Sequence, residues 1–193
     1  MTETLDHIVQ ADQEFFLWLN GMHSYFWDEV MRAITNKFTW IPMYLLLFYG
    51  IISEFKIKAV GYIACILAAV ILSDQIASSL FKPYFMRPRP CYDPVIGHLV
   101  NVVSGCGGQY GFVSSHAATG FAIAMIVNLL PTKNVNAVKW LFLWASIYSY
   151  SRIYVGVHYP LDILFGGLVG VISAILVFLV FRSLDKRGVL RLK

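Results

Sequence analysis

The chain has 193 residues, of which 58% are hydrophobic and 13% carry a charge, and its mean hydropathy is +0.65. This composition is too apolar for a soluble domain of the same length and predicts a protein embedded in a bilayer. The formal net charge of +4 does not indicate a nucleic-acid partner, because the basic residues are scattered over short segments without a platform of aromatic side chains.

The N-terminal segment, residues 1–37, differs from the rest of the chain. It opens with acidic residues and lacks the cationic region and cleavage pattern of a secretory signal. Over residues 12–35, aromatic and aliphatic side chains alternate with charged and polar ones, which is typical of amphipathic helices that lie on a membrane surface. We therefore predict interfacial helices here, with a sixth, shorter membrane span as the alternative.

Apolar segments long enough to cross about 30 Å of hydrocarbon at roughly 1.5 Å per residue follow this region. There are five such segments, near Phe38 to Ser53, Ala59 to Leu80, His116 to Leu130, Val138 to Tyr154 and Leu161 to Phe181. No linker, charge block or internal repeat separates them, so residues 1–193 should form one domain. The predicted fold is all-α: a polytopic membrane helix bundle of five, or six, transmembrane helices over residues 38–182, with a basic tail at 183–193.

The distribution of basic residues predicts the orientation of this bundle. Nine of them fall in alternate connections and in the tail: Lys56, Lys58, Lys133, Lys139, Arg182, Lys186, Arg187, Arg191 and Lys193. Outside the polar motifs described next, the opposite side holds only Arg32 and Lys37. Since cytoplasmic loops are enriched in Lys and Arg, we expect an integral protein of the inner (cytoplasmic) membrane with a cytoplasmic C-terminus. The other face points to the periplasm or cell exterior.

Three polar motifs stand where the predicted spans end on that outward face. They bring together three cations, two imidazoles, a carboxylate and two hydroxyls at Lys82, Arg89, Ser114, Ser115, His116, Arg152, His158 and Asp162. A single Lys or Arg at the end of a span is usually an interfacial residue whose charge reaches the water. Three of them beside Pro, Ser or His favour a phosphate site, because a doubly charged phosphate in a poorly solvated niche needs several cations.

The remaining side chains of the motifs suit phosphoryl chemistry. Ser114 and Ser115 precede a helix whose free N–H groups attract anions, and one of the two should also cap that helix. His116 and His158 can move protons or attack phosphorus near neutral pH, and Asp162 can hold His158 in one tautomer. Zinc bound by these two histidines and Asp162 is the competing interpretation, but the nearby arginines would repel a metal, so we expect neither metal nor cofactor.

The three segments KPYFMRPRP (82–90), VSSH (113–116) and SRIYVGVHYPLD (151–162) resemble the signature motifs of the type 2 phosphatidic acid phosphatase superfamily. The first and third match in full. In the second, Val113 and Ser115 stand where the family usually has Pro and Gly. The number of spans resembles the small bacterial lipid phosphatases within this superfamily, which also includes vanadium-dependent haloperoxidases and soluble acid phosphatases.

This resemblance implies a metal-independent hydrolysis in two steps. His158 would attack phosphorus to form a phosphohistidine, Asp162 would support it, and His116 would protonate the leaving oxygen. The phosphoryl oxygens would be held by Lys82, Arg89, Ser114, Ser115 and Arg152. The expected partner is a phosphorylated membrane lipid: undecaprenyl diphosphate, phosphatidylglycerol phosphate, phosphatidic acid or a lipid A phosphate. The alternatives are a lipid phosphotransferase with the same intermediate and a non-catalytic phospholipid-binding or transport protein.

Other residues carry weaker expectations. Asp74 lies inside the second predicted span, where serines and Gln75 could satisfy it, so we favour a structural role. Arg87 should either widen the cationic patch toward a second phosphate or contact a head group. Cys91 and Cys106 lie in the long outward loop and could form a disulfide in an oxidising compartment or remain free thiols.

Overall fold

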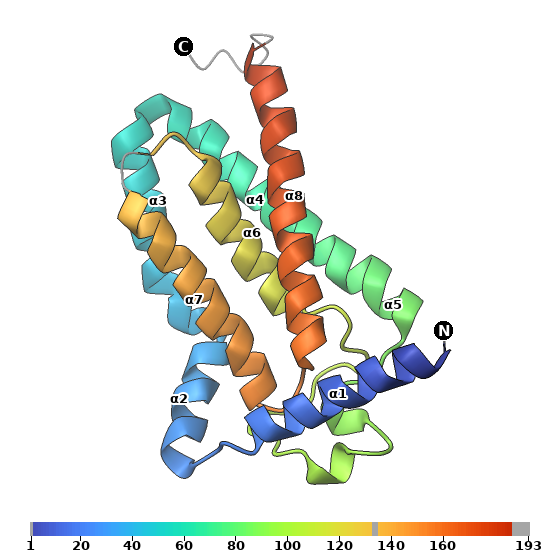
Figure 1. Ribbon diagram of the computed structural model, residues 1–193. Helices are drawn as coiled ribbons and strands as arrows, with labels where there is room; N and C mark the ends of the chain where they lie inside the picture. The colour runs from blue at the N-terminus through green and yellow to red at the C-terminus, as the bar shows by residue number, and fades with distance from the viewer. Residues whose placement is uncertain (1, 133–134, 187–193) are drawn as a thin grey trace.

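The computed structural model describes residues 2–132 and 135–186 and is built from helices (Figure 1). Their bounds are α1 Thr2–Asn20, α2 Tyr25–Thr35, α3 Ile41–Phe55, α4 Ala59–Gln75, α5 Lys82–Phe85, α6 Ser115–Leu129, α7 Val135–Tyr154 and α8 Pro160–Lys186. Within the described ranges, extended structure is limited to one isolated bridge between Pro88 and Tyr110. The prediction of an all-α fold is confirmed.

The helices α3, α4, α6, α7 and α8 form one bundle, with α1 crossing its lower end and α2 lying below α7 (Figure 1). The long loop between α5 and α6, residues 86–114, lies at this same lower end. We call this end, formed by α1, the loop 86–114 and the segment between α7 and α8, the polar end. All three sequence motifs converge there.

Two helical segments, Lys37–Phe85 and Pro160–Asp185, are long and apolar enough to cross a membrane. The first contains a chain reversal at Lys56, whose φ is +53°, so it consists of the antiparallel helices α3 and α4. Large side chains such as Leu45 and Leu176 remain exposed on the outer faces of the bundle, as expected of helices that face lipid. These two segments do not establish five or six spans, so the number of spans stays a prediction. The orientation also stays a prediction, because part of the charge pattern, Lys133 and residues 187–193, lies outside the described residues.

Close contact between α6 and α8 sets the arrangement of the polar end. A Cβ atom added at Gly170 would lie 2.1 Å from the carbonyl oxygen of Ala118 and 2.9 Å from the amide nitrogen of Ala122. Small residues allow such backbone approach between helices in a bundle. The contact continues to the first turn of α8, where the Ser114 amide donates to the carbonyl oxygen of Asp162 at 3.0 Å. The second and third motifs are therefore held side by side.

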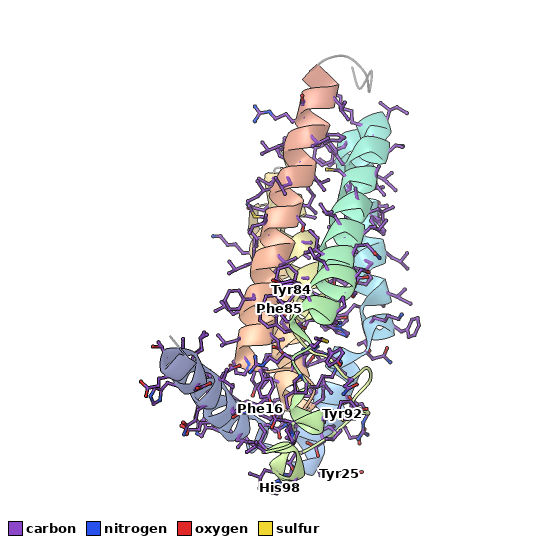
Figure 2. All side chains as sticks on the ribbon, turned by 90° about the vertical axis from the view of Figure 1, so that its right-hand side faces the viewer. Phe16, Tyr25, Tyr84, Phe85, Tyr92 and His98 are labelled. Atoms are coloured by element: carbon purple, nitrogen blue, oxygen red, sulfur yellow. A yellow bond between two sulfur atoms is a disulfide. The ribbon has the colours of Figure 1, made fainter. Side chains whose placement is uncertain are left out.

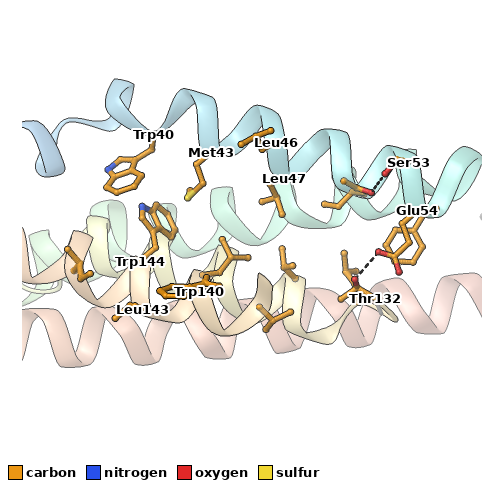
Figure 3. A pocket seen from close by; sticks show the side chains of 18 residues that line it. Trp40, Met43, Leu46, Leu47, Ser53, Glu54, Thr132, Trp140, Leu143 and Trp144 are labelled. Atoms are coloured by element: carbon orange, nitrogen blue, oxygen red, sulfur yellow. Dashed lines mark hydrogen bonds between the residues drawn. The ribbon is translucent and has the colours of Figure 1, made fainter. Parts of the chain in front are cut away.

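A cavity of about 750 Å³ lies between α3 and α7 (Figure 3). Its walls are mostly apolar, with the T-shaped pair Trp40 and Trp144 at one end, 5.7 Å between ring centroids. Glu54 accepts a hydrogen bond from Thr132 at the other end. Among the described residues that line this cavity, none belongs to the predicted site.

The helix α1 packs on the bundle through one face. Phe16 is fully buried against Tyr159, with ring centroids 5.3 Å apart, whereas Phe15 and Trp18 on the other face are exposed. Figure 2 shows Phe16 at the same end of the molecule as Tyr92 and His98 of the long loop. The last residue of α1, Asn20, donates to the carbonyl oxygen of Tyr154 at 2.8 Å and so fastens α1 to the end of α7. Contact of α1 with a membrane surface stays a prediction.

Candidate active site

The first and second motifs meet where α4 and α5 approach the start of α6. A π-helical segment, Ile76–Phe81, joins α4 to α5, and such segments often occur at functional sites. Lys82 Nζ donates to Ser115 Oγ at 3.0 Å, and Ser78 Oγ lies 2.9 Å from the same atom. Ser78 also donates to Asp74, which gives that acid the structural partner expected from the sequence. Ser114 is the N-cap of α6 and is fully buried.

The third motif forms a buried pair between His158 and Asp162. The imidazole Nδ1 lies 3.2 Å from Asp162 Oδ2, which also accepts from the amide of Tyr159 at 3.0 Å. On the other side of the ring, Nε2 lies 3.3 Å from an Arg89 guanidinium nitrogen. Because a guanidinium group has only donors, Nε2 must be the acceptor and Nδ1 must carry the proton. This geometry assigns a neutral imidazole oriented by a carboxylate.

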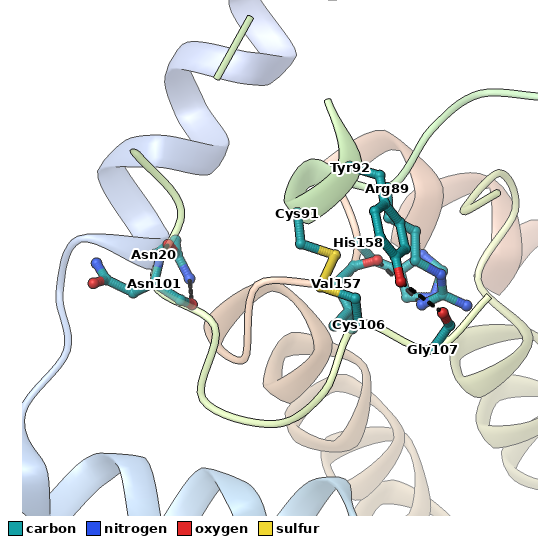
Figure 4. The surroundings of a disulfide bond; sticks show 9 residues. All are labelled: Asn20, Arg89, Cys91, Tyr92, Asn101, Cys106, Gly107, Val157 and His158. Carbon is teal, nitrogen blue, oxygen red and sulfur yellow. Dashed lines mark hydrogen bonds between the residues drawn. A yellow bond between two sulfur atoms is a disulfide. The ribbon is translucent and has the colours of Figure 1, made fainter. Parts of the chain in front are cut away.

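Arg89 is held by the loop of the polar end. Its amide donates to the carbonyl oxygen of Gln109 at 3.0 Å, and its side chain also donates to the carbonyl oxygen of Val157. A disulfide joins Cys91 to Cys106, with 6.2 Å between their Cα atoms, and closes this loop beside Arg89 (Figure 4). Of the two states that the sequence left open for these cysteines, the structure has the disulfide.

The loop also reaches the His158–Asp162 pair through Gly111. A Cβ atom added there would lie 3.0 Å from Asp162 Oδ2, 3.3 Å from Arg89 Cγ and 3.5 Å from His158 Nδ1. A larger residue would therefore push against the two side chains that orient His158. The glycine is part of the wall of the site, and nothing in its sequence context indicated this.

Arg152 and His116 complete the cluster. Arg152 donates to Thr35 Oγ1 at 2.6 Å, so the end of α2 helps to orient this guanidinium group. The imidazole of His116 stacks on Tyr148, with ring centroids 5.0 Å apart. The positive charges of Arg152 and Lys82 both act on His116. Residues from four helices thus share one electrostatic environment.

This environment changes the proton affinity of His158. Its pKa is well below the usual value for histidine, because the ring is buried and because positive charges on Arg89, Arg152, Lys82 and Arg87 oppose protonation. Burial also lowers the pKa of Arg89. His158 therefore stays neutral at and somewhat below neutral pH, which leaves Nε2 without a proton.

Arg87 makes contacts within the protein that the sequence did not suggest. Its guanidinium group bridges two carboxylates, with NH2 2.7 Å from Asp12 Oδ2 and NH1 3.1 Å from Asp162 Oδ1. It also lies over the ring of Tyr159 at 4.0 Å. Both anionic partners belong to the protein, so Arg87 has structural contacts that the sequence did not suggest. A contact of Arg87 with a second phosphate or with a head group stays a prediction.

A second cavity, of about 440 Å³, leads from the site into the bundle between α3 and α4. The charged and polar residues Lys37, Asp74, Ser115 and His116 line it. The rest of its wall is mostly apolar or aromatic and comprises Tyr44, Leu47, Phe48, Ile66, Leu67, Val70, Thr119, Ile123 and Tyr148. A hydrocarbon chain fits the chemistry of this wall.

The structure thus brings together all eight residues predicted from the motifs. Direct hydrogen bonds link Lys82 to Ser115, Arg89 to His158, and His158 to Asp162. Sequence reasoning missed Asp12, Thr35 and Gly111, which come from segments without any motif. For Asp12, the available signal was a charged residue on the helix face that also carries Phe16.

The sequence model of the PAP2 superfamily, the type 2 phosphatidic acid phosphatases, matches residues 62–186 of the chain. The chain belongs to this superfamily. The match covers the three motifs and the helices that carry them, so the resemblance stated from the motifs is confirmed.

Several relatives agree with this assignment. The chain is 34% identical to a lipid A 4'-phosphatase of Bacteroides thetaiotaomicron over 95% of its own length and 82% of the relative's. It is 32% identical to a lipid A 4'-phosphatase of Porphyromonas gingivalis, over 92% and 75% of the two chains. The protein is therefore a phosphatase, and its relatives support a membrane lipid phosphatase.

Solved structures show the same fold. The crystal structure of Aquifex aeolicus LpxE superposes with a TM-score of 0.67 and 27% identity, over 86% of this chain and 93% of that one. A transmembrane phosphatidylglycerolphosphate phosphatase of the same type from Bacillus subtilis gives a TM-score of 0.62 at 18% identity, over 94% and 87% of the chains. The second likeness concerns the fold alone.

Proposed function

We propose that this protein hydrolyses a phosphate monoester on a lipid through a phosphohistidine formed on His158, without a metal. The observation that carries the proposal is the orientation of the buried imidazole. Nδ1 is directed at Asp162 and Nε2 at Arg89, 3.2 and 3.3 Å away. A neutral histidine held by a carboxylate is a competent nucleophile, and the guanidinium group marks where phosphoryl oxygens would lie.

In the first step, Nε2 of His158 attacks phosphorus and the bond between phosphorus and the lipid oxygen breaks. His116 donates a proton to that oxygen, while Asp162 stabilises the positive charge that develops on the His158 ring. In the second step, water attacks the phosphohistidine and gives its proton to His116. The N–P bond breaks and inorganic phosphate leaves with the enzyme restored.

Lys82, Arg89, Arg152 and the start of α6 at Ser114 and Ser115 are assigned to bind the phosphoryl oxygens. The Nε–H groups of both arginines are buried and have no hydrogen-bond partner in the described part of the chain. Buried donors without partners cost free energy. Phosphate oxygens would satisfy them and would offset the mutual repulsion of the three cations.

We assign a lipid A type of phosphate monoester as substrate, in preference to undecaprenyl diphosphate, phosphatidylglycerol phosphate and phosphatidic acid. The support is the 34% and 32% identity to two lipid A 4'-phosphatases over most of the chain. The apolar cavity beside His116 can take part of an acyl chain while the phosphate lies at the polar end. We further propose a multi-pass protein of the inner membrane whose polar end faces the periplasm.

The test is phosphate release by purified protein in detergent from these four lipids, with and without EDTA. We expect release from lipid A to exceed that from the other lipids and to persist in EDTA. His158→Ala should lower kcat by about 10³-fold or more, as loss of a nucleophile does. His98→Ala, a histidine exposed on the long loop, is the matched control and should retain activity. Full activity of His158→Ala, or complete dependence on a divalent metal, would refute the mechanism.

A further inference from the structure

The amphipathic helix α1 reaches the His158–Asp162 pair through Arg87. Asp12 is only 5% exposed, although it lies on a helix whose other acids face the solvent. Its carboxylate contacts Arg87 at 2.7 Å, and Arg87 contacts Asp162 at 3.1 Å. A continuous series of polar contacts therefore runs from Asp12 through Arg87 and Asp162 to His158.

Further contacts restrict Asp12 and Arg87 to this geometry. The second carboxylate oxygen of Asp12 accepts from the amide of Leu161 at 3.0 Å, in the first turn of α8. The Arg87 guanidinium lies over the Tyr159 ring, and Tyr159 in turn donates to Asp93 at 2.7 Å. Because α1 thus binds both Arg87 and the backbone next to Asp162, it fixes the two groups relative to each other.

We propose that Asp12 and Arg87 are positioning residues that hold Asp162, and through it His158, in the orientation needed for attack on phosphorus. The inference rests on the proposed function of His158. Neither residue contacts the phosphate in this scheme. Their part is to keep the buried Asp162 carboxylate in one rotamer and charged, because a buried carboxylate without a cation is strongly disfavoured.

The geometry assigns different tasks to the two residues. The planar guanidinium group of Arg87 spans two carboxylates with two separate nitrogens, which the point charge of a lysine cannot do. Asp12 keeps Arg87 from turning toward the phosphate site, where Arg89 and Arg152 already lie. Loss of either residue should therefore disturb the Nδ1 side of His158 and leave the phosphate-binding side in place.

The experiment is steady-state kinetics of Asp12→Asn in detergent with the lipid that the wild-type protein hydrolyses. Partners that orient a functional side chain from behind contribute about 10-fold or more in activity, so kcat should fall by at least that factor. KM should change by less than about twofold, because the phosphate ligands are untouched. Glu14→Gln is the matched control: it removes the same charge from the exposed face of α1, where Glu14 accepts a hydrogen bond from Gln10 of the same helix, and should behave as wild type.

Arg87→Lys provides a second variant that keeps the positive charge. We expect a similar fall in kcat with unchanged KM. Since both residues act through Asp162, the combined variant Asp12→Asn/Arg87→Lys should lose far less than the product of the two single losses. Thermal unfolding of each variant shows whether the protein is folded at the assay temperature.

The outcomes separate this inference from the proposed function. Wild-type kcat in folded Asp12→Asn or Arg87→Lys would overturn the positioning role, even if His158→Ala is inactive. Losses in KM alone, or losses that Glu14→Gln shares, would also overturn it. If wild-type protein releases no phosphate from any lipid, or His158→Ala stays active, the proposed function itself fails.

Discussion

The middle of the bundle and its polar end are built from different contacts. Where α6 packs on α8, small residues such as Ala118, Ala122 and Gly170 bring two backbones into direct contact. At the polar end, hydrogen bonds and ion pairs join segments that are far apart in sequence, such as Asp12 and Leu161. The first region sets which helices are neighbours, and the second sets how side chains point. Substitutions in the middle of the bundle should therefore lower stability, whereas substitutions at the polar end should lower catalytic activity.

The largest effect is expected from Gly170→Ala in the middle of the bundle. The new Cβ would meet backbone atoms that cannot move aside, since one of them is only 2.1 Å away. Forced packing of this kind costs about 3 kcal/mol of unfolding free energy. Denaturant or thermal unfolding in detergent measures it. Gly50→Ala on α3, where a Cβ would meet open space, is the control, and an equal loss in both variants would show that the close helix contact is unimportant.

A smaller effect of a different kind is expected from Gly111→Ala at the polar end. Its Cβ would press on Asp162 and Arg89, which orient His158, and misplacement of a reacting group by about 1 Å lowers activity by roughly 10- to 100-fold. Unfolding should change little, because no helix contact is altered. Gly108→Ala, in the same loop but with open space around its Cβ, should keep full activity. Normal kcat in Gly111→Ala would argue against the geometry of the polar end.

The smallest effect concerns pH. The pKa of His158 is lowered by burial and by the cations around it, so the acid limb of kcat/KM should lie below the usual histidine value of about 6.5. The folded protein binds this proton more weakly than the unfolded chain, so unfolding free energy should also fall as the pH drops below about 6.5. Rate profiles between pH 5 and 8 measure the limb. A limb at or above pH 6.5, after correction for ionisation of the lipid phosphate, would contradict a cationic, buried site.

The sequence predicted most of the site because its motifs sit at helix ends. Spacing predicted that Ser114 or Ser115 caps α6 and that Asp162 lies near His158, since both relations are local and follow from helix geometry. Arg87 shows a contact that local spacing cannot predict. Its cationic character suggested a phosphate ligand, but the charge is taken up by Asp12, 75 positions away, and no local pattern connects the two.

The length of the apolar segments and the chemistry of the motifs are properties of the sequence itself. They determined the helices, the superfamily and the central residues of the site. Tertiary structure alone decided that α1 supports the His158–Asp162 pair, that Gly111 forms its wall, and that Thr35 orients Arg152. The physical reason is that helix formation and capping depend on neighbours in sequence. The partner of a buried charge depends on which segments the packed bundle brings together.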